Sequence, residues 1–212
     1  MNAVCYNVLL YYSDNYVRDM LILCEKLHSF FCLLDKYFIS GFLGQGPDDL
    51  RSKMYTFWLK CAGSKIGKNS FVHHSVKVWR PQNISIGENV RVPASTDMAG
   101  MGRITIGNNV LIGAHVSFIT NDHNLEDSQM SWKNKMIGLQ SDIVIQDYTW
   151  LMNCSMIVAG KNGITLGKCS WVGAGSVVTK NIPHHQLWGG CPAKFIRNFA
   201  DQIGRASCRE RV

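Results

Sequence analysis

The central part of the chain carries an aliphatic or aromatic residue at every sixth position. The first run is Ile66, Val72, Val78 and Ile84, and after a shift of two residues the rhythm resumes at Ile86 and Val92. Further runs are Ile104, Ile106, Ile112 and Phe118, then Ile145, Leu151 and Ile157, then Leu166, Val172 and Val178. An amphipathic helix repeats near 3.6 residues and a strand repeats at two, so neither explains this period. The pattern predicts a parallel β-helix, in which stacked coils of three short faces bury one continuous core.

Two secondary patterns agree with this prediction. Small or branched residues recur four places after an anchor, as a narrow interior requires: Ser70, Val76, Val90, Val110, Val116, Ser155, Ser170 and Ser176. Glycine often follows the anchor directly, where backbone freedom helps the chain turn a corner: Gly67, Gly87, Gly107, Gly113, Gly167 and Gly173. We therefore predict a β-helical domain over residues 64–183.

One coil of the predicted β-helix is longer than the others. The interval between equivalent anchors is 20 from Ile86 to Ile106 and 21 from Ile145 to Leu166, but it is 39 from Ile106 to Ile145. The difference, 39 minus 20, is an insertion of about 19 residues, which we place at about 124–142. It is polar and begins directly after His123. A single long interruption in a regular repeat usually has a function.

Residues 1–63 lack the six-residue rhythm and form a predicted N-terminal helical segment. Apolar residues recur at helical spacing between Tyr16 and Phe42, and a second helix is expected from a cap at Asp49 to Cys61, ended by Gly63. Interspersed charges argue against a membrane span, and we recognise no signal peptide. Two arrangements stay open for the first helix: packing on the domain or a neighbouring subunit, or lying at the inner face of a membrane.

Composition narrows the class of protein. The chain is 46% hydrophobic and 17% charged, with a formal charge of +7. Residues 203–212 read as the translation of a sequencing adapter, so we expect a non-native tail, preceded by a C-terminal extension over 184–202. Moderate basicity without a basic tract and interleaved aromatics gives no indication of nucleic-acid binding. The eight cysteines are scattered without a CxxC pair, which favours reduced thiols and a cytoplasmic protein.

The chain resembles the hexapeptide-repeat acyltransferases, and among them the maltose/galactoside-type and polysaccharide O-acetyltransferases. The resemblance rests on IGENV, ITIGNNVLIGAHVSF, the histidine and loop that follow, VGAGSVVTKNIP and GGCPAKFIR. It implies an all-β fold, a left-handed parallel β-helix, assembled as a homotrimer with active sites between subunits. It also implies acetyl-CoA as acyl donor, no metal, and a hydroxyl of a sugar or surface-polysaccharide precursor as acceptor.

The predicted catalytic residue is His123, which matches the catalytic histidine of this family. Acyl transfer from a thioester requires removal of the hydroxyl proton, and histidine titrates near neutrality, so it suits a general base. Asp122 precedes it and is a candidate for the acceptor pocket, although neighbours on an extended strand point in opposite directions. The partner that orients the imidazole stays open.

The remaining site residues come from the resemblance. Lys180, Lys194 and Arg197 match positions that contact coenzyme A, whose phosphates need cationic donors. Ala174 and Thr179 match positions beside the pantetheine arm, and Asn153 lies where the family often has a small polar contact residue. Trp150 matches a tryptophan beside the active-site cleft, where it would contact substrate.

Two alternatives of other classes stay open. The first is a non-catalytic β-helical scaffold in which His123 has no chemical role. The second is a zinc-dependent enzyme like the carbonic anhydrases of this fold. Catalytic zinc needs three converging ligands, and His73, His115 and His123 lack the spacing that the resemblance would require, so zinc is the weaker alternative.

Overall fold

The computed structural model describes residue 26 and residues 50–99, 101–122 and 139–199. The helix expected between Tyr16 and Phe42 lies outside these ranges except for Lys26, which is helical. The cap at Asp49, the catalytic candidate His123 and the tail over 203–212 also lie outside them.

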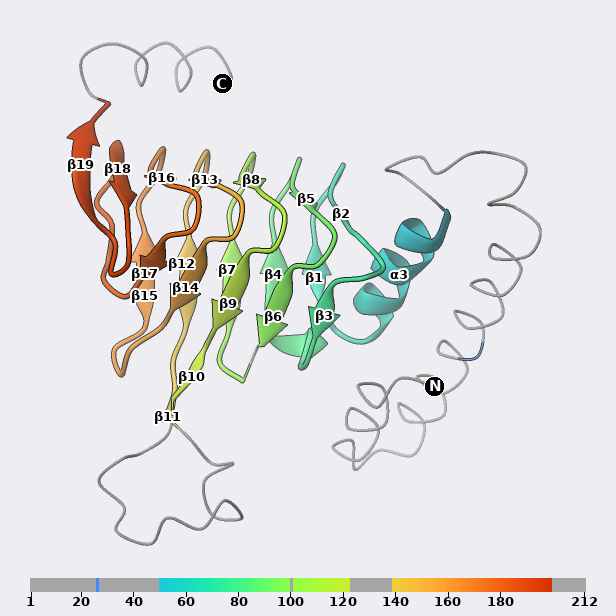
Figure 1. Cartoon of the computed structure of the whole chain (residues 1–212). Coiled ribbons are helices and arrows are strands. Elements are labelled where there is room, and N and C mark those ends of the chain that lie inside the picture. The colour runs from blue at the N-terminus through green and yellow to red at the C-terminus, as the bar shows by residue number, and fades with distance from the viewer. Residues whose placement is uncertain (1–25, 27–49, 100, 123–138, 200–212) are drawn as a thin grey trace, which may run out of the picture.

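The predicted second helix is present as α3 (Leu50–Cys61). Gly63 ends it at φ +99°, a left-handed conformation that favours glycine. The amide of Ser64 donates to the carbonyl of Leu59 at 2.9 Å, and that of Gly63 to Lys60 at 3.1 Å, which is the Schellman pattern. The helix covers one end of the β-helix (Figure 1), where its Thr56 hydroxyl accepts a hydrogen bond from the amide of Val72 at 2.9 Å. The core is therefore closed at its N-terminal end.

Three sheets form the sides of the β-helix. The first sheet contains β1 (Lys65–Ile66), β4 (Ile84–Ile86), β7 (Ile104–Ile106), β12 (Ile143–Ile145) and β15 (Ile164–Leu166). The second contains β2 (Phe71–Val72), β5 (Arg91–Val92), β8 (Leu111–Ile112), β13 (Trp150–Leu151), β16 (Trp171–Val172), β18 (Gln186–Gly189) and β19 (Lys194–Asn198). The third contains β3 (Lys77–Val78), β6 (Asp97–Ala99), β9 (Ser117–Ile119), β14 (Met156–Val158) and β17 (Val177–Val178). All strands of the three sheets pair in parallel except β18 and β19, which pair antiparallel. A short 3₁₀ turn, η2 (Pro81–Asn83), precedes β4.

The six-residue pattern correctly identified the core. Most anchors are buried, and Phe118 and Leu151 have no exposed surface. All eight small residues expected four places after an anchor are buried as well. Ile66 and Ile112 are exceptions, since each is only partly buried. Each coil therefore places aliphatic side chains in the interior, as the pattern predicts.

Three of the five corners between the first and second sheets place an asparagine in left-handed backbone, and Tyr148 and Cys169 occupy that position in the other two. Asn69, Asn89 and Asn109 have φ of 55°, 57° and 54°, values that asparagine adopts more readily than most residues. Their side chains also form a ladder, in which the amide of Asn69 donates to Asn89 and that of Asn89 to Asn109, each at 3.2 Å. At these three corners the residue type suits the backbone conformation.

The insertion leaves the coil as a two-stranded ribbon. β10 (Asn121–Asp122) pairs antiparallel with β11 (Leu139–Gln140), and the ribbon projects from the side of the β-helix (Figure 1). At its base the amide of Ser141 donates to the carbonyl of Thr120 at 2.9 Å. Ile104 pairs with Ile143, so the register of the sheet reproduces the long interval counted between the anchors.

Two further findings concern the sequence-based expectations. Cys61, Cys154 and Cys191 are free thiols, but Cys169 is disulfide-bonded, so the expectation of uniformly reduced cysteines is wrong at that position. Across the described ranges, no helix is both long enough and apolar enough to cross a bilayer.

Candidate active site

The candidate site residues lie at two edges of the third sheet and on the second sheet. We call the corners that lead from the second to the third sheet the second edge (residues 73–76, 93–96, 113–116, 152–155 and 173–176). The corners that lead from the third sheet back to the first form the third edge, which carries the insertion. Three residues of a strand span about 10 Å, which is the separation of the two edges across the third sheet.

The third edge holds the insertion and two of the predicted donor contacts. Asp122 is in β10 and is the last described residue before His123. Thr179 and Lys180 follow β17 directly, and both are exposed. Two strand spacings separate β9 from β17 in the third sheet, which corresponds to about 10 Å. The base of the insertion and Thr179 therefore lie on the same edge, two coils apart.

Asn153 and Ala174 lie on the second edge, and both are exposed. The side-chain carbonyl of Asn153 accepts a hydrogen bond from the amide of Ala114 at 3.1 Å, and its main-chain carbonyl accepts one from Gly175 at 3.0 Å. The side-chain oxygen of Asn153 therefore already joins neighbouring coils. Its side-chain NH₂ is the group that it can offer to a cofactor.

Trp150 stands on the outer face of the second sheet as one member of an aromatic row. Its ring meets Trp171 edge-on at 5.1 Å between centroids, and Trp171 lies 4.2 Å from Phe199. The guanidinium of Arg197 lies 5.4 Å from the centre of the Phe199 ring. Trp150 and Arg197, predicted from the resemblance alone, are thus connected through Trp171 and Phe199.

Lys194 is exposed on β19, the outermost strand of the second sheet, together with Arg197. The amide of Ala193 donates to the carbonyl of Val177 at 2.8 Å, which holds the start of β19 beside β17. The predicted donor contacts within one chain therefore occupy the second sheet and both edges of the third. The described part of one chain does not bring them to a single face.

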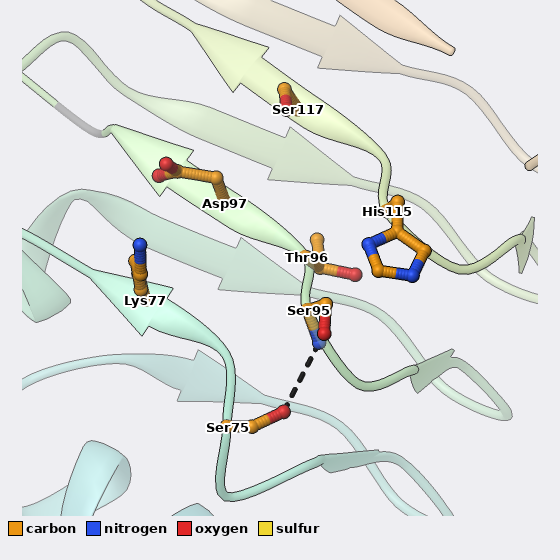
Figure 2. Close-up of a pocket in the computed structure, with 7 residues that line it drawn as sticks. All are labelled: Ser75, Lys77, Ser95, Thr96, Asp97, His115 and Ser117. Atoms are coloured by element: carbon orange, nitrogen blue, oxygen red, sulfur yellow. Dashed lines mark hydrogen bonds between the residues drawn. The ribbon is translucent and has the colours of Figure 1, made fainter. Parts of the chain in front are cut away.

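A polar groove that sequence reasoning missed lies on the outer face of the third sheet, beside the second edge (Figure 2). Its volume is about 390 Å³, and it is lined by Ser75, Lys77, Ser95, Thr96, Asp97, His115 and Ser117. Lys77, Asp97 and Ser117 are register partners on three adjacent strands. Each directly precedes a buried position and they recur once per regular coil, so the spacing of the repeat could have grouped them.

One oxygen of this groove has no partner. The Oδ1 atom of Asp97 is buried, and no described residue donates a hydrogen bond to it. Thr96 is buried, and its hydroxyl is committed to the carbonyl of Pro93 at 2.9 Å. Within the described ranges, no three His, Cys, Asp or Glu side chains gather closely enough to hold a metal ion.

Known proteins are similar to this chain in sequence and in fold. No model of a protein family matches the chain. It is 30% identical over 141 residues to the Escherichia coli K12 protein WcaF, named as a colanic acid biosynthesis acetyltransferase, which is 66% of this chain and 72% of that protein. It is also 30% identical over 137 residues to the galactoside O-acetyltransferase of Escherichia coli K12, covering 65% of this chain and 64% of that enzyme.

A solved structure gives the same class. The hexapeptide-repeat acetyltransferase VCA0836 of Vibrio cholerae, complexed with acetyl coenzyme A, has a TM-score of 0.62 and 28% identity, over 72% of this chain and 80% of that one. The chain belongs to the hexapeptide-repeat acetyltransferases, and its fold is their left-handed parallel β-helix. It spans 55%, 64% and 72% of the length of the first three curated relatives it matches.

Proposed function

We propose that this protein transfers an acetyl group from acetyl-CoA to a hydroxyl of a sugar or polysaccharide precursor. The observation that carries the proposal is the polar insertion, which opens directly after His123 in a chain related to acetyltransferases. A relative is named a galactoside O-acetyltransferase, and the Vibrio cholerae structure contains acetyl coenzyme A. These names support a thioester donor and a carbohydrate acceptor.

In the proposed reaction His123 removes the proton of the attacking hydroxyl as its oxygen bonds to the thioester carbon. The C–S bond then breaks, and the departing sulfur takes the proton from the imidazolium of His123, so coenzyme A leaves as the thiol and the base is neutral again. A neutral imidazole at physiological pH can take the proton, which gives a general base a rate contribution of about 10² to 10⁴. Binding also holds the acceptor oxygen in line with the thioester carbon, and this orientation increases the rate further.

The donor would be held by the exposed residues assigned from the resemblance. Lys180, Lys194 and Arg197 supply positive charge for the phosphates. Thr179 and Ala174 border the pantetheine arm, with the amide of Asn153 as a hydrogen-bond donor. Trp150 and Asp122 would line the acceptor side.

A homotrimer is part of the proposal, because the site residues lie on different faces of one chain. The second sheet carries Trp150, whereas the insertion leaves from the third edge. Leu111, the neighbour of Trp150 in the sheet, is 61% exposed, which is unusual for a large aliphatic residue on a flat strand. Packing this face against the third edge of another copy would cover Leu111 and unite the two halves of the site.

The test compares the His123→Ala variant with the unmodified protein. Each is given acetyl-CoA and a panel of sugars, and release of the coenzyme A thiol is measured. We expect turnover to fall by about 10² to 10⁴, with coenzyme A binding and the oligomeric state unchanged. His184→Ala is the matched control, because it removes an exposed imidazole that follows the last coil. Turnover of His123→Ala equal to that of the unmodified protein would refute the role of His123.

A non-catalytic scaffold makes a different prediction, which a thermal-shift titration distinguishes. Acetyl-CoA at 100 times its dissociation constant should stabilise an acetyltransferase by about 2.7 kcal/mol. A scaffold that does not bind the thioester would show no shift at any concentration of acetyl-CoA.

A further inference from the structure

We propose that the N-terminal end of the β-helix docks on an anionic lipid surface, with Phe57 entering the headgroup layer and the lysines around it binding lipid phosphates. This inference goes beyond the proposed acetyl transfer and does not depend on it. The protein would lie on the bilayer, since no helix of the described ranges is long and apolar enough to cross one.

The formal charge of the chain is concentrated at this end. Between Asp49 and Glu88 the sequence holds seven lysines and arginines and no carboxylate. The rest of the chain has 22 minus 7, or 15, cations against 15 carboxylates, so its formal charge is zero. The whole excess of +7 therefore belongs to residues 50–87, which comprise α3 and the first coil with β4. An excess of this kind attracts anionic surfaces.

The lysines of this range are accessible to a ligand. β1, β2 and β3 are each the terminal strand of their sheet, so they form the coil that α3 covers (Figure 1). Five lysines lie on α3 and on this coil, and all are exposed and form no ion pair with a residue of the described ranges: Lys53, Lys60, Lys65, Lys68 and Lys77. The cations thus gather at one end of the solenoid.

The helix α3 places an apolar side chain between two of these lysines. Lys53, Phe57 and Lys60 lie at positions i, i+4 and i+7, which share one stripe of a helix. Phe57 is 60% exposed, whereas Thr56 and Leu59 of the same helix are buried. A phenylalanine that projects between ammonium groups is typical of helices that lie in the headgroup layer of a membrane.

A second aromatic side chain is exposed at the same end. Trp79 directly follows β3 and is 52% exposed. Tryptophan prefers the boundary between lipid headgroups and acyl chains, because its ring is apolar and its indole N–H donates a hydrogen bond. The other large hydrophobic residues exposed in the described ranges are Leu111 on β8 and Phe195 and Ile196 on β19. Exposed aromatic rings and excess positive charge therefore coincide at the N-terminal end.

A lipid surface explains these features better than a nucleic acid does. The exposed cations of residues 50–87 are all lysines, whereas arginine, with its planar fork of donors, is the residue that best matches nucleic-acid phosphates. The stripe from Lys53 to Lys60 extends about 10 Å along the outside of a helix. It can therefore rest on a flat surface, with both ammonium groups near the phosphates and Phe57 directed into the lipid.

The test is cosedimentation of the full chain with vesicles made of equal parts phosphatidylglycerol and phosphatidylcholine, with phosphatidylcholine vesicles as the neutral comparison. We expect binding to the anionic vesicles alone, and weaker binding as the salt concentration rises from about 0.1 M to about 1 M. Lys53→Gln combined with Lys60→Gln should raise the Kd about 25-fold, at about 5-fold for each lysine. Phe57→Ala should raise it about 10-fold, because its apolar surface no longer enters the lipid.

Matched controls remove the same groups elsewhere on the molecule. Lys161→Gln combined with Lys168→Gln neutralises two exposed lysines of later coils, and Phe195→Ala removes an exposed phenylalanine of β19. Both controls should leave the Kd for anionic vesicles unchanged. Should thermal melts show that the α3 variants fold poorly, Lys65→Gln combined with Lys68→Gln provides a second pair outside the helix, with the same expected increase of about 25-fold.

The outcomes distinguish this inference from its alternatives. It is overturned by a lack of binding to anionic vesicles, by equal binding to neutral ones, or by losses in the control variants as large as those in the α3 variants. Tighter binding to a duplex oligonucleotide than to the vesicles, unaffected by Phe57→Ala, would assign the basic end to nucleic acid instead. None of these results bears on acetyl transfer, which is measured separately by thiol release.

Discussion

Two buried serines at equivalent positions of the repeat should respond oppositely to removal of their hydroxyls. The hydroxyl of Ser70 donates to the carbonyl of Gly87 at 2.7 Å and accepts from the amide of Val90 at 2.8 Å. The hydroxyl of Ser155 is buried and has no hydrogen-bond partner among the described residues. Both serines lie four places after an anchor, so Ser70→Ala and Ser155→Ala make the same chemical change in the same structural setting.

The magnitudes follow from these contacts. Ser70→Ala removes two hydrogen bonds and leaves the buried amide of Val90 without a partner, at a cost of about 1 to 3 kcal/mol. In a domain of this size each kcal/mol of lost stability lowers the Tm by about 2 to 4 °C. The middle of the range, a loss of about 2 kcal/mol, should therefore lower the Tm by about 4 to 8 °C. Ser155→Ala removes an unsatisfied oxygen, and we expect the Tm to stay the same or rise by about 2 °C.

Calorimetry of the two variants beside the unmodified protein provides the measurement, with urea midpoints to check that m is unchanged. The reasoning depends on the difference between the variants, because general effects of serine-to-alanine changes cancel. Equal losses of stability for Ser70→Ala and Ser155→Ala would refute it. The interior hydroxyls would then be acting through packing volume alone.

Two further predictions concern the corners. Gly107→Ala should destabilise the folded protein by several kcal/mol or prevent folding, because the new Cβ would lie 2.8 Å from a backbone nitrogen of the next coil. Gly160→Ala is the control: its Cβ would meet nothing within 4 Å, so thermal melts should show an unchanged Tm. Burial, then the charges of His184 and Lys168, lower the pKa of His185 below its usual 6.5, so the unfolded chain binds this proton more readily. Stability should therefore fall as the pH drops from 6.5 through the lowered pKa, and His185→Asn should reduce that fall in urea midpoints compared at pH 5 and pH 8.

The sequence predicted the interior of the β-helix well, because burial constrains inward positions strictly. Phe118 and Leu151 were identified from spacing alone and are fully buried. The end of α3 was also predictable, since Gly63 adopts a backbone conformation that few residues tolerate. Ile112 is only partly buried despite its place in the rhythm, so a repeat gives the direction of a side chain more reliably than its final exposure.

Outward positions were much less predictable. Asp97 follows no hydrophobic rule, and its place in the groove appears only when adjacent coils set it between Lys77 and Ser117. The β18 and β19 pair was also missed, because the six-residue rhythm ends before it and its antiparallel register obeys a different constraint. The resemblance supplied Lys194 and Arg197 on β19, but composition and periodicity did not.

The base of the insertion shows how the coil supports the proposed site. The Arg103 guanidinium donates to the Asp142 carboxylate at 3.0 Å, and the Arg103 amide donates to its other oxygen at the same distance. Burial raises the pKa of Asp142, but the hydrogen bonds and the charge of Arg103 outweigh burial and hold that pKa below its usual value, which favours the ionised carboxylate. The returning chain is thereby fixed to the coil that precedes the insertion. Because the base of the insertion is fixed in this way, the insertion leaves undisturbed the register of the coils that would hold donor and acceptor.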